Sequence, residues 1–186
     1  MAGAKEIVSQ GINNGAPPLP LYLSLAEAAQ KAGSPEQTKA ALNSAKAEVE
    51  KSVKNGEDSY SLYFVLADGA RRIGDRDQET AALVKALDFQ PRSADALSRL
   101  AGLYLQKQNF DRAALYLNRI ANINPDSADV YYRIAQAEEG RYRFAAAGAA
   151  YARAVELAPQ NANFAKRYEE FKMRVERNRN TPAADR

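Results

Sequence analysis

The chain has 186 residues, 46% of them hydrophobic, a net charge of +3, and neither cysteine nor histidine. Such a composition supports a continuous apolar core and argues against wholesale disorder. It also excludes disulfides, thiolate and histidine metal sites, and catalytic triads with a histidine base. No apolar run approaches the ~18 residues of a transmembrane helix, and the scattered glycines form no nucleotide-binding fingerprint. We therefore expect no enzymatic activity, no cofactor, no metal site and no transmembrane segment.

Residues 1–20 are predicted to be a flexible leader. The segment 11–20, Gly-Ile-Asn-Asn-Gly-Ala-Pro-Pro-Leu-Pro, is rich in glycine and proline and should not continue a helix. Residues 2–10 are expected either to form a short helix or to stay disordered. Because residues 1–7 lack the long apolar stretch of a signal peptide, we predict a cytoplasmic location. The alternative is a periplasmic or envelope-associated protein whose signal sequence has been removed.

Residues 21–178 are predicted to form one helical domain, and its first part, about residues 19–59, is a divergent helix pair. Apolar residues recur at helical spacing until residues 33–35 (Gly-Ser-Pro) break the pattern. Proline is tolerated in the first turn of the next helix, which is expected over about 35–53. Residues 55–56 (Asn-Gly) end that helix, as glycine commonly does just past a helix C-terminus.

Three blocks of equal length follow this divergent pair. Pro91, Pro125 and Pro159 are spaced by 34 and 34 residues (125−91 and 159−125), and each closes one block. The blocks are residues 60–93, 94–127 and 128–161. Self-similarity at this period is typical of helix–turn–helix repeats that stack, because no single helix pair can bury its apolar face alone.

The last predicted helix, residues 162–178, differs from the others. Its apolar residues form one narrow stripe surrounded by charge: Phe164, Tyr168, Phe171 and Val175. Such a helix is suited to cap the last repeat. Residues 162–186 hold seven basic and four acidic residues, which is the whole excess of +3, and residues 179–186 are expected to be disordered.

These blocks resemble the tetratricopeptide repeat, whose first helix carries a large apolar residue, a leucine and a small residue. Its second helix carries alanines, and a proline closes the unit. Block 94–127 matches with Leu97, Leu100, Ala101, Tyr104, Phe110, Ala113, Leu117 and Pro125. Block 128–161 departs at Glu138 and matches with Tyr131, Ile134, Ala135, Phe144, Ala147, Tyr151, Ala154 and Pro159. Block 60–93 departs at Glu79 and matches with Tyr63, Leu66, Ala67, Gly74, Leu83, Ala86 and Pro91.

The family has a small residue where this chain has Glu79, which argues against close packing of that helix pair at this point. The resemblance implies an all-α, right-handed α-solenoid of helix-turn-helix repeats with a C-terminal capping helix. It also implies a concave groove lined by the first helix of each repeat. The implied groove positions are Phe64, Asp68, Arg71, Arg72, Asp95, Arg99, Gly102, Asp129, Tyr132, Arg133 and Gln136.

Two patterns favour a groove that binds a partner. Phe64 and Tyr132 are aromatic residues beside the core pattern, and Arg99 and Arg133 recur at equivalent positions. Aromatic and arginine side chains are the usual interface anchors. The alternative is that Asp95–Arg99 and Asp129–Arg133 are i,i+4 pairs that only brace their own helices.

One subfamily holds the C-terminal carboxylate of a chaperone tail with a clamp of lysine and asparagine. The matching positions in this chain carry Leu23, Glu27, Val65, Asp95 and Arg99. Only Arg99 fits that clamp, so binding of such a tail is not expected.

We therefore predict a non-enzymatic adaptor or assembly subunit that binds a peptide or helix of a partner protein in the groove, as part of a multiprotein assembly. One alternative is a structural subunit that docks by its convex face or N-terminal leader. Another is association with nucleic acid or an acidic surface through the basic C-terminal helix. Nucleic acid is disfavoured because most tyrosines lie at core positions instead of forming a stacking platform. The alanine-rich, cysteine-free composition indicates a bacterial protein.

Overall fold

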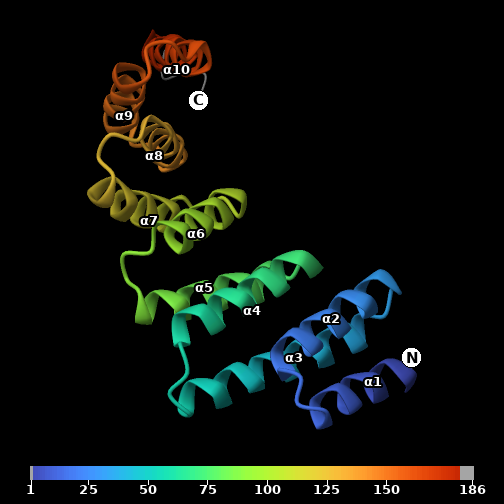
Figure 1. The fold of residues 1–186 in the computed structure, drawn as a ribbon. Helices are drawn as coiled ribbons and strands as arrows, with labels where there is room; N and C mark the ends of the chain where they lie inside the picture. The colour runs from blue at the N-terminus through green and yellow to red at the C-terminus, as the bar shows by residue number, and fades with distance from the viewer. Residues whose placement is uncertain (1, 181–186) are drawn as a thin grey trace. The chain divides into compact units, whose positions relative to one another are not determined.

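The computed structural model describes residues 2–180, and this part of the chain folds into ten α-helices without a strand (Figure 1). Helices α2 to α9 form four consecutive antiparallel pairs, and α10 follows them. The prediction of an all-α fold built from helix pairs is confirmed. The helices are α1 (Ala2–Asn13), α2 (Pro18–Lys31), α3 (Pro35–Lys54), α4 (Ser59–Ile73), α5 (Arg76–Phe89), α6 (Ala94–Gln106), α7 (Phe110–Ile123), α8 (Ala128–Gly140), α9 (Phe144–Leu157) and α10 (Ala162–Asn180).

The helices group into two compact units, Met1–Ala96 and Leu97–Arg186. In the first unit α1 packs on α2, α2 on α3, α3 on α4, and α4 on both α5 and α2. In the second unit α7 packs on α8, α8 on α9, and α9 on α10. Within the described residues, no helix is long and apolar enough to cross a membrane.

The N-terminal segment is helical, which is one of the two alternatives for residues 2–10, but the helix continues to Asn13 and is not the flexible leader expected for residues 1–20. Helix α1 runs through Gly11 to Asn13, and Val8 is buried where α1 packs on α2. A Cβ atom on Gly11 would lie 3.0 Å from a methyl group of Leu21, so the missing side chain permits the close approach. Pro18 opens α2 without loss of a hydrogen bond, because the first-turn N–H groups have no partner within the helix.

Small residues set the close contacts between helices, as the repeat pattern predicts. Ala67, Ala101 and Ala135 occupy equivalent places in α4, α6 and α8, and all three are fully buried. A Cβ atom on Gly69 would lie 2.3 Å from a methyl group of Leu23, so this glycine lets α2 approach α4. A larger residue at any of these places would force the helices apart or the side chains out of their rotamers.

Glu79 does not loosen the second block, and that expectation is wrong. Helices α4 and α5 pack against each other, and Glu79 itself is 4% exposed within the contact. The residue lies in the first turn of α5, where the positive end of the helix dipole favours a carboxylate. The next residues along the buried side, Ala82 and Leu83, are almost fully covered.

The C-terminal helix covers the last pair. Phe171 is 3% exposed and its ring lies 5.2 Å from that of the fully buried Tyr151 of α9. The ring of Tyr168 stacks on that of Tyr151 at 6.2 Å. Helix α10 is two residues longer than the predicted 162–178. Most of the expected disordered tail, residues 181–186, lies outside the described residues.

Candidate partner-binding face

The predicted groove residues divide between the two units. The first unit holds Phe64, Asp68, Arg71 and Arg72 on α4 and Asp95 on α6. The second unit holds Arg99 and Gly102 on α6 and Asp129, Tyr132, Arg133 and Gln136 on α8. All of them belong to the first helices of their repeats, because α4, α6 and α8 open the last three blocks.

On the first unit, Phe64 is half-buried beside a second aromatic residue. Its ring stacks on that of Tyr60 at 5.5 Å, one helical turn earlier on α4. The hydroxyl groups of Tyr60 and Ser93 are joined by a hydrogen bond of 2.7 Å. This bond fixes Tyr60, and Tyr60 in turn supports the half-buried ring of Phe64.

The charged residues of the same face are paired with one another. The guanidinium of Arg71 lies 3.4 Å from the carboxylate of Asp68, one turn earlier on α4. Arg72 reaches across to α2, where its Nε lies 2.6 Å from Oε1 of Glu27. Both pairs are partly open to solvent, where ion pairs contribute little to stability and exchange readily with the charges of a partner.

On the second unit, Arg133 crosses from α8 to α6. Its Nη1 donates to the hydroxyl of Ser98 at 3.2 Å, and its Nη2 donates to the Ser98 carbonyl at 3.3 Å. A Cβ atom on Gly102 would lie 3.3 Å from Nη2, so the guanidinium lies close over this glycine. The predicted bracing of α8 through Asp129 is replaced by this link between two helices.

Tyr132 is part of the packing of α10 on α8, which its sequence position did not indicate. Its ring stacks on Phe164 at 4.6 Å and meets Tyr151 edge-on at 5.7 Å. Tyr132 also lines an open hollow of about 490 Å³ with residues of α10, among them Asn161, Lys166 and Arg167. Tyr132 therefore packs against α10 and also lines a surface hollow.

Of the other predicted groove residues in this unit, Arg99 is half-buried and Asp129 is exposed. Gln136 lines a second hollow, of about 460 Å³, together with Leu105 of α6, Phe110 of α7 and Arg167 of α10. Arg167 thus belongs to the walls of both hollows.

Glu139, which is not among the residues predicted from the sequence, holds the end of the second unit together. Its carboxylate accepts a hydrogen bond of 2.9 Å from the hydroxyl of Tyr151 and bonds of 3.2 Å from Arg167, and it also pairs with Arg174. Burial, followed by the hydrogen bond to Glu139, raises the pKa of Tyr151 to about 12. These partners lie 12, 28 and 35 residues away along the chain, so no local pattern signals the cluster.

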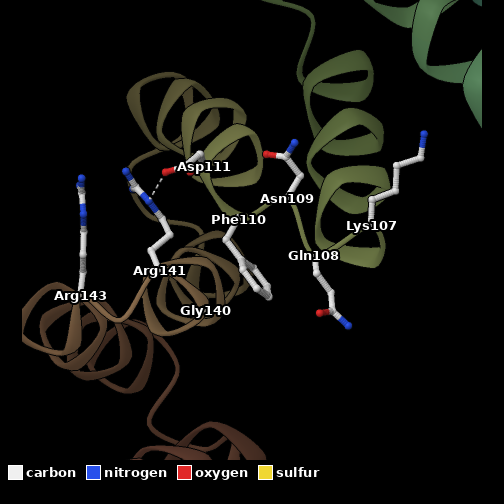
Figure 2. Close-up of a pocket in the computed structure, with 8 residues that line it drawn as sticks. All are labelled: Lys107, Gln108, Asn109, Phe110, Asp111, Gly140, Arg141 and Arg143. Atoms are coloured by element: carbon white, nitrogen blue, oxygen red, sulfur yellow. Dashed lines mark hydrogen bonds and ion pairs between the residues drawn. The ribbon is translucent and has the colours of Figure 1, made fainter.

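A second ion-pair cluster holds the turn between α8 and α9. Arg141 pairs with Asp111 of α7 at 2.8 Å (Figure 2). It also pairs with Glu138 at 2.7 Å. Glu138, the departure from the family pattern, is 6% exposed and supplies the inner partner of this arginine. The residues around Arg141 line an open hollow of about 520 Å³ (Figure 2). Its other lining residues include Lys107 and Phe110.

Helix pairs repeated at 34 residues, with small residues at the helix contacts, define an α-helical repeat protein. Models of the tetratricopeptide repeat match residues 78–138 and 128–161, so this part of the chain consists of tetratricopeptide repeats. No curated protein matches the sequence.

Solved structures of the same fold include bacterial and human proteins. MamA (residues 41 to the end) from Desulfovibrio magneticus RS-1 is 19% identical, with a TM-score of 0.61 and coverage of 85% of each chain. The first tetratricopeptide domain of human RPAP3 is 18% identical, with a TM-score of 0.56, covering 66% of this chain and 97% of that one. The first repeat domain of Spaghetti (RPAP3) bound to the HSP90 peptide SRMEEVD is also 18% identical, with a TM-score of 0.56, covering 63% and 93%. These similarities show a shared fold.

Proposed function

We propose that the protein is a non-enzymatic adaptor whose first-helix faces bind an extended peptide or a helix of a partner protein within a larger assembly. The family assignment supports binding in general. A tetratricopeptide domain of the same fold is known with a bound peptide, and that peptide belongs to its own partner.

The observation that carries the proposal is the placement of Arg133. Two nitrogen atoms of its guanidinium are tied to Ser98, and Gly102 leaves room for the group on the surface of α6. A guanidinium has five N–H donors in a rigid plane, so the remaining donors are oriented for a carboxylate or carbonyl of a partner. Fixing the side chain beforehand reduces the entropy that a partner must offset on binding.

The structure gives less support to the alternatives. The buried side of the N-terminal helix α1 is occupied by α2, so docking through that segment would use only its outer residues. In α10, Arg167 and Arg174 are held by Glu139, and Lys172 lies 2.7 Å from Glu169. These pairs neutralise much of the basic charge that would attract nucleic acid.

The lysine–asparagine clamp is also absent at the positions that the resemblance identifies. Leu23, at one clamp position, is 2% exposed and packs against Gly69. Glu27, at another, is paired with Arg72 and would repel a carboxylate. We therefore propose that the partner is held through internal residues of a peptide or helix and that its terminal carboxylate plays no part.

Site-specific photo-crosslinking tests which face the partner covers. A benzophenone amino acid replaces Phe64 on the first-helix face in one variant and Phe89 in the other. Phe89 lies on the second helix α5 and is 49% exposed, so it is a matched aromatic control. We expect a partner adduct from position 64 and none from position 89. An adduct from position 89 alone would support docking through the second helices and reject the proposal.

A further inference from the structure

The turns within the last two helix pairs, α6–α7 and α8–α9, replace glycine at a position where the backbone is left-handed. Gly74, Gln108 and Tyr142 are spaced by 34 and 34 residues (108−74 and 142−108), and their φ angles are 80°, 54° and 59°. In each turn the next residue donates its amide to a carbonyl five residues earlier, so the three turns have the same backbone. Only glycine adopts this conformation without strain, and a bulky aromatic residue is the least suited to it.

The strain at Tyr142 is not offset by burial of its side chain. Its side chain is 81% exposed, more than that of any other large hydrophobic residue in the described part of the chain. Its ring meets only the partly exposed Phe144 edge-on, at 6.2 Å. A strained residue without a role in the core points to a function outside the fold.

The residue after Tyr142 also lacks the helix-capping side chain that the equivalent residues of the earlier turns have. Asp75 and Asn109 are N-caps whose side chains accept hydrogen bonds from the backbone of α5 and α7, at 2.9 and 3.2 Å. The equivalent N-cap of α9 is Arg143, whose side chain makes no capping bond. The first turn of α9 also has no acidic residue, unlike that of α5 and α7. Two adjacent residues thus forgo stability at one exposed turn.

The turn that carries these two residues is held rigidly from within. Arg141 is fixed between Asp111 and Glu138. The ring of Phe110 lies against the backbone of Gly140 (Figure 2). A Cβ atom on Gly140 would lie only 2.4 Å from that ring. Tyr142 and Arg143 therefore project from a preformed support.

The charged residues around the turn indicate which kind of partner would bind there. The hollow of Figure 2 is lined by Lys107, Arg141 and Arg143, and Asp111 is its one acidic lining residue. Asp111 and the buried Glu138 both pair with Arg141, so the three basic groups exceed these two carboxylates by one charge, and the surface beside Tyr142 is positive. The second hollow shares Phe110 with the first and is lined by Leu105 and Tyr142 together with Gln136, Glu139 and Arg167. Leu105, Phe110 and Tyr142 give it an apolar wall on which an apolar side chain can pack.

We infer that this turn surface, formed by Lys107, Phe110, Tyr142, Arg143 and Phe144, is a second docking site that binds an acidic segment of a partner protein. Tyrosine and arginine are the residues most enriched among interface anchors. An aromatic or aliphatic side chain of the segment packs on Tyr142, and its carboxylates face Arg143 and Lys107. The site is separate from the first-helix face and does not depend on the function proposed for that face.

The test uses the double variant Tyr142→Gly with Arg143→Asp, which places at this turn the same residue types as Gly74 and Asp75. The probe is a fluorescein-labelled peptide of repeated Asp-Glu-Leu-Phe, and its counterpart has Lys and Arg in place of the acidic residues. We expect the wild type to prefer the acidic peptide, and the variant to lose at least about 10-fold in affinity, as for the loss of one anchor. The variant should also melt about 2 °C higher or more, because strain is removed and a cap restored.

A control variant separates the site from general electrostatics. Leu115→Ser with Arg153→Asp removes one exposed apolar residue and changes the net charge by the same amount, at a distance from the turn. This control should keep the wild-type affinity for the acidic peptide, and so should Tyr142→Phe. Equal binding of acidic and basic peptides by the wild type, or equal losses in the test and control variants, would overturn the inference.

A single-stranded oligonucleotide of the same net charge as the acidic peptide serves as a competitor. One exposed tyrosine and two basic residues do not form the extended track that single strands need. We expect weak competition from the oligonucleotide, and competition equal to that of the unlabelled peptide would assign the surface to nucleic acid instead.

Discussion

The first-helix faces of the two units use their polar side chains differently. On the first unit, Arg71 and Arg72 form exposed ion pairs with Asp68 and Glu27, and these pairs hold little of the fold. On the second unit, Arg133 is tied to α6, and Glu139 ties α8 to α9 and α10. The comparison shows that polar side chains on the first helices form exposed ion pairs in one unit and hold helices together in the other.

Replacement of Glu139 by alanine should give the largest difference between the faces. It removes the acceptor of Tyr151, Arg167 and Arg174 together, and we expect a loss of about 2 kcal/mol or more in the free energy of unfolding. Glu27→Ala, on the first unit, should change it by at most about 0.5 kcal/mol. Urea denaturation measures both values, and equal losses would remove the distinction between the two faces.

High pH should weaken the second unit through Tyr151. Its pKa is raised to about 12 in the folded protein from 10.0, so the folded state favours the neutral hydroxyl. This contribution to stability is complete below pH 10 and is lost as the pH rises from 10 towards 12. Tyr151→Phe should reduce the fall in stability over this range, as measured by urea denaturation at several pH values. An unchanged pH dependence in this variant would show that Tyr151 is not the group responsible.

Two glycine substitutions should affect the units unequally. In Gly69→Ala the new Cβ would lie 2.3 Å from the buried side chain of Leu23, and the overpacking should cost about 1 kcal/mol after the gain in helix propensity. In Gly102→Ala the nearest atom is Nη2 of Arg133 at 3.3 Å, the end of a flexible side chain. The stability of this second variant should stay within about 0.5 kcal/mol of the wild type. Thermal melts compare the two, and a larger loss for Gly102→Ala would contradict the assigned contacts.

The sequence was enough to predict the helix pairs and their contacts, because these follow from local periodicity. Ala67, Ala101 and Ala135 were recognised as close contacts from their spacing alone, and all are buried. A short helix over residues 2–10 was one of the alternatives, but its continuation to Asn13 was not predicted because Gly11 favours a helix end, while the close approach of Gly11 to Leu21 depends on the tertiary structure.

The candidate site was less predictable, because the positions of its side chains depend on contacts with residues far away in the sequence. Tyr132 was expected to be a partner anchor, yet it stacks on Phe164 of α10. Glu139 was missed because its partners come from α9 and α10. Arg133 was identified from its repeat position, but the glycine and serine that fix it became evident only from the packing of α8 on α6.

The affinity of the natural partner, once a pull-down has identified it, tests the central claim that the first-helix faces bind it. Calorimetric titration compares the wild type with Phe64→Ala, Arg133→Ala and the control Arg153→Ala on the second helix α9. We expect each face variant to lose about 10-fold or more in affinity, which corresponds to about 1.4 kcal/mol, with the fold intact. The control should bind as the wild type does. Unchanged affinity in both face variants, with normal melting curves, would contradict the account and place the partner elsewhere on the protein.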